Sequence, residues 1–161
     1  DVTLGGGPWD AAESHPEHVV LYVEDQLSNL DLMERIFERR PQISLLTAMQ
    51  GQLGLEIARQ ERPDLVLLDL NLPDISGEEV LKRLRQDPRT AEVTVVVLSA
   101  DANEMSVKRM LAAGASAYLT KPVDVGKLLA FVDERMATKT GGTPDRLQQR
   151  SEFVRAPQEI L

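Results

Sequence analysis

Short apolar runs alternate with longer amphipathic stretches through most of this chain, and this alternation restricts its fold more than any other feature. Five runs, several of them rich in β-branched residues, have the character of buried strands. They are Val19–Val23, Ile43–Ala48, Leu65–Leu68, Val93–Leu98 and Ala117–Leu119. Runs that are apolar on both faces are typical of a parallel sheet covered by helices on each side.

The segments between these runs have helical spacing, because their apolar residues recur at intervals of three and four. Examples are Leu30, Met33 and Phe37, then Val80, Leu81 and Leu84, then Val107, Met110 and Leu111. Gly114 lies where a left-handed helix cap is expected, Pro63 closes the second helix, and Pro73 and Gly77 bracket the loop after the third strand. The pattern predicts five strands and five helices in strict alternation, an α/β fold with a doubly wound five-stranded parallel sheet.

The length allows one well-packed domain with tails, since 161 residues are too few for two full-sized domains. Residues 1–17 include three successive glycines and two prolines, which predicts a linker or an added tail. We place the domain at residues 18–138. Residues 139–161 are expected to form a C-terminal tail. It begins with a Gly/Thr/Pro break, Thr138 to Pro144, and the segment Asp145 to Leu161 has room for one short helix.

Composition excludes several classes of function. The net charge of -8 argues against direct nucleic-acid binding, which requires a basic surface. The chain has no cysteine, so disulfides and thiolate metal sites are impossible, and a cytoplasmic location fits this composition. Since no apolar run reaches the roughly 20 residues that span a bilayer, we expect no membrane contact by this domain.

Polar residues follow four of the predicted strands. Glu24 and Asp25 end the first strand and Asp69 ends the third. Since the carboxyl ends of parallel strands share one edge of the sheet, these three carboxylates are expected to converge. Carboxylates so close together repel one another, and a hard cation that prefers oxygen ligands relieves the repulsion. The sequence therefore favours Mg²⁺ at this edge.

The fourth strand ends at Ser99, and the fifth is followed by Lys121 and Pro122. The same edge would then hold an acidic cluster, a hydroxyl group and an ammonium group. This set suits transfer of a phosphoryl group to a carboxylate, with Asp69 as the nucleophile and with Lys121 and Ser99 holding phosphoryl oxygens.

Each of these residues also has a simpler interpretation. Glu24-Asp25 alone is more often a solvated turn, and Asp69 or Ser99 alone could cap a helix. Lys121 could be an ordinary surface lysine. Their common position at the strand ends favours the functional interpretation.

Residues 18–137 resemble the receiver domain of bacterial response regulators, which has a flavodoxin-like (βα)5 fold. The matching motifs are Val23-Glu24-Asp25, Leu67 to Pro73 with Gly77, Leu98-Ser99-Ala100 and Lys121-Pro122. The resemblance implies that a histidine kinase or a histidine phosphotransfer protein phosphorylates Asp69. It also implies that the domain catalyses only its own phosphorylation and dephosphorylation.

The resemblance further implies direct Mg²⁺ ligation by Asp25 and Asp69, ligation by Glu24 largely through water, and a ligand from the backbone carbonyl of Asn71. It implies a cis peptide bond before Pro122. Ser99 and Tyr118 would form the switch, which is read out on the surface of the fourth helix, fifth strand and fifth helix. Asn71 and Asp101 would tune the phosphoryl lifetime, and because both are polar we expect fast self-dephosphorylation.

The segment Glu24 to Leu30 is most similar to receivers of hybrid sensor histidine kinases or to stand-alone receivers. Because the sequence has no output domain and begins with linker-like residues, we expect a receiver from a hybrid kinase, with a stand-alone regulator as the alternative. Gly114 to Tyr118 lacks the acidic residues with which DNA-binding regulators dimerise, and the oligomeric state stays open. An aspartyl phosphohydrolase is a weaker alternative because Asn71 replaces the general acid that such enzymes need. A receiver-shaped scaffold without phosphorylation is the third alternative, and the intact acidic site argues against it.

Overall fold

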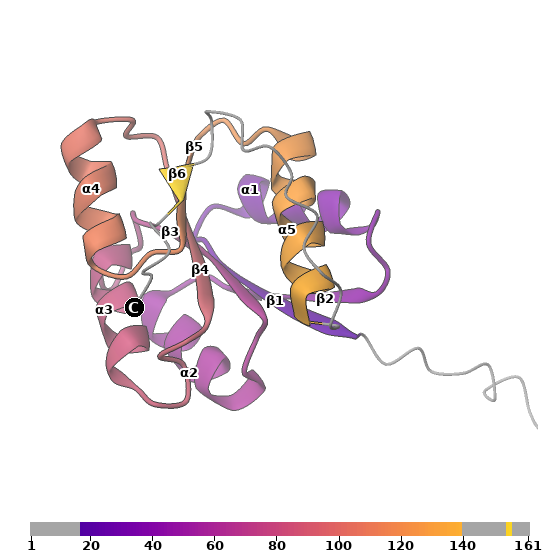
Figure 1. The fold of residues 1–161 in the computed structure, drawn as a ribbon, viewed down its shortest axis with the longest axis horizontal. Helices are drawn as coiled ribbons and strands as arrows, with labels where there is room; N and C mark the ends of the chain where they lie inside the picture. Colours follow the sequence, from indigo (N-terminus) through magenta and orange to yellow (C-terminus); the bar gives the residue numbers. More distant parts are fainter. Residues whose placement is uncertain (1–16, 140–153, 156–161) are drawn as a thin grey trace, which may run out of the picture.

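The computed structural model describes residues 17–139 and the two residues 154–155 (Figure 1). The predicted N-terminal linker, apart from Glu17, lies outside the described residues, and so does most of the predicted C-terminal tail. Within the described part, no helix is both long enough and apolar enough to cross a membrane.

The described residues form strands and helices in alternation, as predicted. The strands are β1 (His18–Val23), β2 (Ile43–Ala48), β3 (Leu65–Asp69), β4 (Thr94–Ser99), β5 (Ala117–Thr120) and β6 (Val154–Arg155). The helices are α1 (Leu27–Phe37), α2 (Gly51–Glu61), α3 (Gly77–Gln86), α4 (Glu104–Ala112) and α5 (Val125–Lys139).

The sheet has the order β2-β1-β3-β4-β5-β6. The first five strands are parallel, which confirms the predicted doubly wound α/β fold. The strand β6 was not predicted, and it pairs antiparallel with the outer edge of β5. Within the expected C-terminal tail, Lys139 extends α5 and Val154–Arg155 are extended, so the short helix predicted there does not include Val154–Arg155.

Two apolar layers cover the two faces of the sheet. The helices α1 and α5 pack on one face, where Phe37 and Val132 are among the buried residues. The helices α2, α3 and α4 pack on the other, with Leu55, Leu84 and Met110 buried. Both faces of the central strands are therefore dry, which explains their continuous apolar runs.

The predicted breaks lie at helix ends. Arg62, just before Pro63, caps α2 in a left-handed conformation with φ 45°. Gly114, two residues after α4, has φ 109°, a conformation that a side chain rarely adopts. At this turn the chain passes from α4 into β5.

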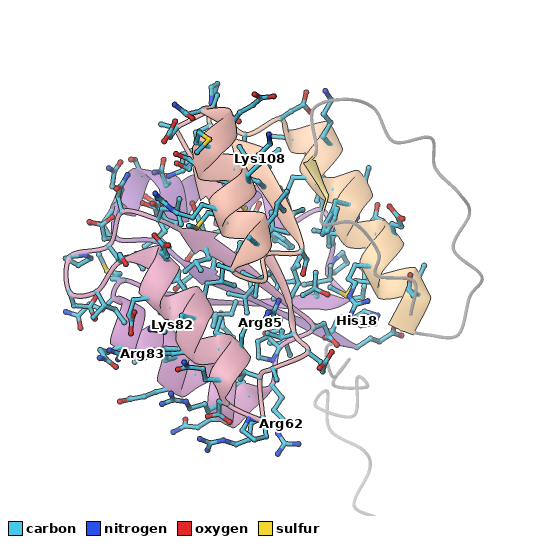
Figure 2. The ribbon with its side chains drawn as sticks, turned by 60° about the vertical axis from the view of Figure 1, so that its left-hand side comes forward. His18, Arg62, Lys82, Arg83, Arg85 and Lys108 are labelled. Atoms are coloured by element: carbon cyan, nitrogen blue, oxygen red, sulfur yellow. The ribbon has the colours of Figure 1, made fainter. Side chains whose placement is uncertain are left out.

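Arg85 at the end of α3 ties three segments together. Its guanidinium donates hydrogen bonds to the carbonyl oxygens of Ala91 at 3.0 Å, Val93 at 2.7 Å and Gly114 at 2.8 Å. In Figure 2 Arg85 is directed toward the interior of the domain, whereas its neighbour Arg83 projects from the helix. Arg85 therefore holds the approaches to both β4 and β5.

Gly77 at the start of α3 lies against the chain that leaves β3. A Cβ atom at this position would lie 2.3 Å from the carbonyl oxygen of Asp69 and 2.6 Å from Cα of Leu70. The Gly77 amide donates a 3.0 Å hydrogen bond to the carbonyl oxygen of Leu70. Only glycine permits this close approach of two backbone segments, which fixes where β3 ends.

We expect Arg85→Met to lower the free energy of unfolding by about 2–4 kcal/mol, because three partly buried carbonyl groups would lose a charged donor. The matched control is Arg83→Met in the same helix, since Arg83 pairs with the partly exposed Glu79 at 3.0 Å. Such exposed pairs contribute roughly 0.5 kcal/mol. Urea unfolding measures the free energy of unfolding of both variants. An equal decrease in the two variants would contradict the role of Arg85.

We expect Gly77→Ala to lower the free energy of unfolding by about 1–3 kcal/mol, because the added methyl group overlaps backbone atoms that have little room to move. Gly126→Ala in α5 is the control, since its added Cβ would meet nothing closer than a side-chain oxygen at 3.4 Å. That change should be neutral or stabilising by about 0.5–1 kcal/mol. A neutral Gly77→Ala variant in urea unfolding would refute the close-approach argument.

Candidate functional site

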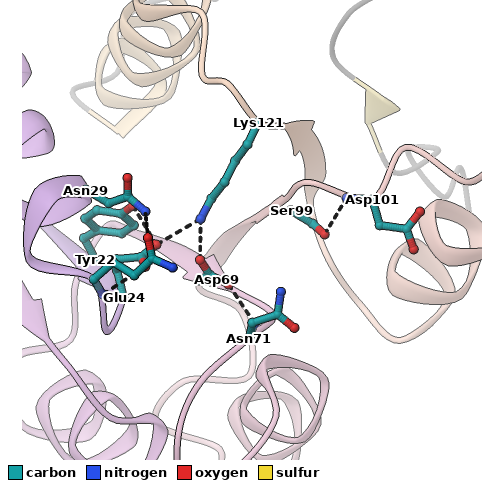
Figure 3. Close-up of polar contacts among 9 residues, drawn as sticks. Tyr22, Glu24, Asn29, Asp69, Asn71, Ser99, Asp101 and Lys121 are labelled. Atoms are coloured by element: carbon teal, nitrogen blue, oxygen red, sulfur yellow. Dashed lines mark hydrogen bonds and ion pairs between the residues drawn. The ribbon is translucent and has the colours of Figure 1, made fainter.

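The predicted polar residues gather where β1, β3 and β5 end, beside the end of β4 (Figure 3). The strand order makes this possible, because β3 lies between β1 and β4 in the sheet. Register pairs Asp69 with Leu98, one residue before Ser99, and pairs Val23 with Leu68. Glu24, Asp69 and Ser99 therefore leave three neighbouring strands at nearly the same level.

Asp69 is the last residue of β3 and is buried, with 4% of its surface exposed. One carboxylate oxygen accepts a 2.7 Å hydrogen bond from the backbone amide of Asn71. The other accepts a hydrogen bond from the ammonium group of Lys121. The carboxylate is thus held on both sides by donors.

Glu24 is completely buried directly after β1. Its carboxylate accepts hydrogen bonds from the amide of Gln26, from the hydroxyl of Tyr22 and from Lys121, each at 3.1 Å. Tyr22 was not among the residues predicted for this site. Alternation along a strand could have identified it, since residues two positions apart point to the same face.

Lys121 lies directly after β5 and donates to both Glu24 and Asp69. Its backbone amide donates a 2.8 Å hydrogen bond to the carbonyl oxygen of Ser99, which anchors the residue to the end of β4. The Lys121–Pro122 peptide bond is cis, the conformation that the resemblance implies. One ammonium group therefore bridges the carboxylates that follow β1 and β3.

Burial and the nearby Glu24 raise the pKa of Asp69 to about 6, although Lys121 acts in the opposite direction. Burial would also raise the pKa of Glu24, but hydrogen bonding with Asp69 and Lys121 outweighs it and lowers that pKa. Burial tends to lower the pKa of Lys121, whereas its bonds to the two carboxylates raise it. Asp69 is thus the carboxylate of this pair that holds its negative charge less readily.

The donor set fits a hard divalent cation by type, because carboxylate and carbonyl oxygens are the ligands that Mg²⁺ prefers. Asp25 is half-buried beside Glu24, and Asn71 is exposed two residues after Asp69. In the part of the chain that the structure describes, no three Asp, Glu, His or Cys side chains are grouped closely enough to hold a metal ion. The carboxylates of Glu24 and Asp69 are gathered around the ammonium group of Lys121 instead.

Ser99, Asp101 and Tyr118 form a second chain of contacts beside this cluster. The amide of Asp101 donates to the Ser99 hydroxyl at 3.1 Å, and the buried Tyr118 donates its hydroxyl proton to the carbonyl oxygen of Asp101 at 2.5 Å. The Asp101 carboxylate accepts from the Asn103 amide and the Ser106 hydroxyl, and it points away from Asp69 in Figure 3.

Residues 20–133 match the model of the response regulator receiver domain family. The chain is 34% identical over 113 residues to the polar-differentiation response regulator DivK of Brucella anthropi, which covers 70% of this chain and 91% of that protein.

Solved structures agree with this match. A CheY-like response regulator receiver domain protein from Methanospirillum hungatei JF-1 superposes with a TM-score of 0.69 at 27% identity, covering 77% of this chain and 97% of that one. A second solved structure is the receiver domain of the sensor histidine kinase PA1611 from Pseudomonas aeruginosa PAO1, which has a magnesium ion coordinated in its active-site cleft. It superposes with a TM-score of 0.67 at 24% identity. That comparison covers 74% of this chain and 98% of that one.

The sequence motifs at the strand ends, the parallel β2-β1-β3-β4-β5 order and the family match over residues 20–133 agree with one another. The resemblance inferred from the sequence is therefore confirmed. This chain belongs to the response regulator receiver domain family of two-component signalling proteins.

Proposed function

We propose that Asp69 accepts a phosphoryl group from a phosphohistidine of a histidine kinase or histidine phosphotransfer protein. The observation that carries the proposal is the position of Asp69, a buried carboxylate at a strand end, held between the Asn71 amide and the Lys121 ammonium group. One carboxylate oxygen attacks phosphorus while the bond from phosphorus to the donor nitrogen breaks and its electron pair stays on the imidazole.

The residues around Asp69 supply positive charge and hydrogen-bond donors for this step. Lys121 can transfer its hydrogen bond from the Asp69 carboxylate to a phosphoryl oxygen without leaving Glu24. The Ser99 hydroxyl accepts from the Asp101 amide, and since a hydroxyl can also donate, it can bind a second phosphoryl oxygen. Mg²⁺, held by Asp25, Asp69 and the Asn71 carbonyl and by Glu24 through water, would neutralise charge on the phosphoryl oxygens.

We propose that Ser99 and Tyr118 carry the change to the surface formed by α4, β5 and α5. If the Ser99 hydroxyl turns toward a phosphoryl oxygen, its bond to the Asp101 amide weakens. The carbonyl oxygen of the same residue holds the hydroxyl of Tyr118. Both contacts pass through one residue, so a shift of Ser99 is coupled to Tyr118 by two hydrogen bonds.

We also propose that Asn71 and Asp101 tune the lifetime of the phosphoryl group, with fast self-dephosphorylation. Asn71 is exposed next to the acceptor and could orient a water molecule. The Asp101 carboxylate would first have to leave the Asn103 amide and the Ser106 hydroxyl, to which it is bonded at 2.8 and 2.7 Å. Asn71 is therefore the better placed of the two.

Whether the domain belongs to a hybrid kinase or is a stand-alone regulator is a separate question. The linker-like composition of residues 1–17 favours a receiver of a hybrid sensor histidine kinase, whereas the match to 91% of DivK favours a stand-alone regulator. Sequencing the reading frame on both sides of this chain decides between them, because a kinase core in the same frame supports the hybrid.

Incubation with acetyl phosphate and Mg²⁺ should add one phosphoryl group to the wild type and none to Asp69→Asn, because the amide cannot act as the nucleophile. Asp31→Asn, an exposed carboxylate on α1, is the matched control and should be labelled as the wild type is. Intact-mass spectrometry measures the gain. Labelling of Asp69→Asn to the wild-type extent would refute the acceptor assignment, and Asp69-dependent turnover of p-nitrophenyl phosphate would support the phosphohydrolase alternative.

Lys121→Met should lower the free energy of unfolding by about 2 kcal/mol without metal, because two buried carboxylates would lose their shared cation. Mg²⁺ should then raise the melting temperature of Lys121→Met more than that of the wild type, since the cation replaces the missing charge. Thermal unfolding with Mg²⁺ and with chelator measures both shifts. Lys127→Met is the control, and a Mg²⁺ shift no larger in Lys121→Met than in that control would contradict the charge argument.

A further inference from the structure

The outer edge of β5 is a place where an extended segment can join the sheet. On its inner side β5 pairs with β4 along its whole length, from Ala117 to Thr120. On its outer side the pairing with β6 matches Ala117 with Arg155 and Tyr118 with Val154. Strand edges expose unpaired amide and carbonyl groups, and extended peptides bind them by adding a strand.

In Figure 1 the added strand is drawn between α4 and α5, and it lies at the last edge of the sheet. A cavity of about 410 Å³ opens between α4 and β5, with Val107, Leu111 and Leu119 among its apolar lining. Charged residues of both signs, such as Glu104 and Lys108, also line it. An extended segment on β5 therefore runs beside an apolar hollow with a polar border.

We propose that the C-terminal segment around Val154–Arg155 is an intramolecular ligand of the β5 edge. The segment adds one antiparallel strand to the sheet and covers the outer edge of β5 at Ala117 and Tyr118. A protein that binds this edge through its own main chain must displace the segment first. The edge is thus a docking site with an occupant supplied by the same polypeptide.

Chain length permits this return. The helix α5 has 15 residues, which corresponds to about 22 Å, and it ends at Lys139. Residues 140–153 connect it to β6, and fourteen residues can span up to about 50 Å when extended. The connection is therefore long enough to pass back along the helix. Tethering on this scale raises the local concentration of a segment to the millimolar range, so even a short strand can pair.

The test is amide hydrogen exchange of the full chain, compared between the wild type and the double variant Val154→Pro/Arg155→Pro. Proline donates no backbone hydrogen bond and disfavours strand pairing. We expect exchange in the segment Ala117–Thr120 to accelerate roughly tenfold in the double variant, with β1 and β3 unchanged. The matched control is Gln148→Pro/Gln149→Pro, which places the same two prolines outside β6 and should leave β5 exchange as in the wild type.

Wild-type exchange in β5 of the double variant would overturn the proposal, and so would equal acceleration in the control. Light scattering and exchange at two protein concentrations distinguish pairing within one chain from pairing between two copies. A monomer with concentration-independent protection of β5 supports the proposal, whereas protection that is lost on dilution overturns it in favour of a second copy of this chain. Neither readout requires phosphorylation, so failure of the acceptor assignment would not affect this result.

Discussion

The contact between Lys121 and the carboxylates of Glu24 and Asp69 is the interaction on which this structure depends. It joins the ends of β1, β3 and β5, which are distant in the sequence, through a single ammonium group. Without that cation, two buried carboxylates would face each other in a region of low dielectric, which is unfavourable by several kcal/mol. The cation that stabilises the fold is therefore the same one to which the proposed phosphoryl transfer assigns a role.

Residues around this cluster hold the three charged side chains in position. Gly77 lets α3 begin against the carbonyl group of Asp69, and Arg85 at the other end of the same helix holds the approaches to β4 and β5. Tyr22 reaches Glu24 from within β1. Each support is a close backbone approach or a hydrogen bond to a fixed group, so the carboxylate of Asp69 has little freedom to reorient. That rigidity suits a nucleophile that must attack in line.

Strand β5 connects the two sides of the molecule. Toward Asp69 it leads to Lys121. Through the hydroxyl of Tyr118 it is bonded to the carbonyl oxygen of Asp101, whose amide is bonded to Ser99. Toward the outside its backbone pairs with β6. Asp101 therefore links Ser99 by hydrogen bonds to β5, the strand whose outer edge carries the proposed intramolecular ligand. Coupling of this kind is reciprocal in free energy.

The sequence by itself determined the element order, the parallel fold and the convergence of Glu24, Asp69, Ser99 and Lys121, because apolar runs and strand-end polar residues are local patterns with a fixed periodicity. Only the tertiary structure decided that Lys121 bridges the two carboxylates and that the Asp101 carboxylate points away. The sequence likewise did not predict which carbonyl groups accept hydrogen bonds from Arg85, nor the pairing of β6 with β5. Some of these contacts join residues far apart in the chain, and others depend on the direction of a side chain. Neither long-range contacts nor side-chain directions follow a local periodicity, so they could not be predicted from the sequence.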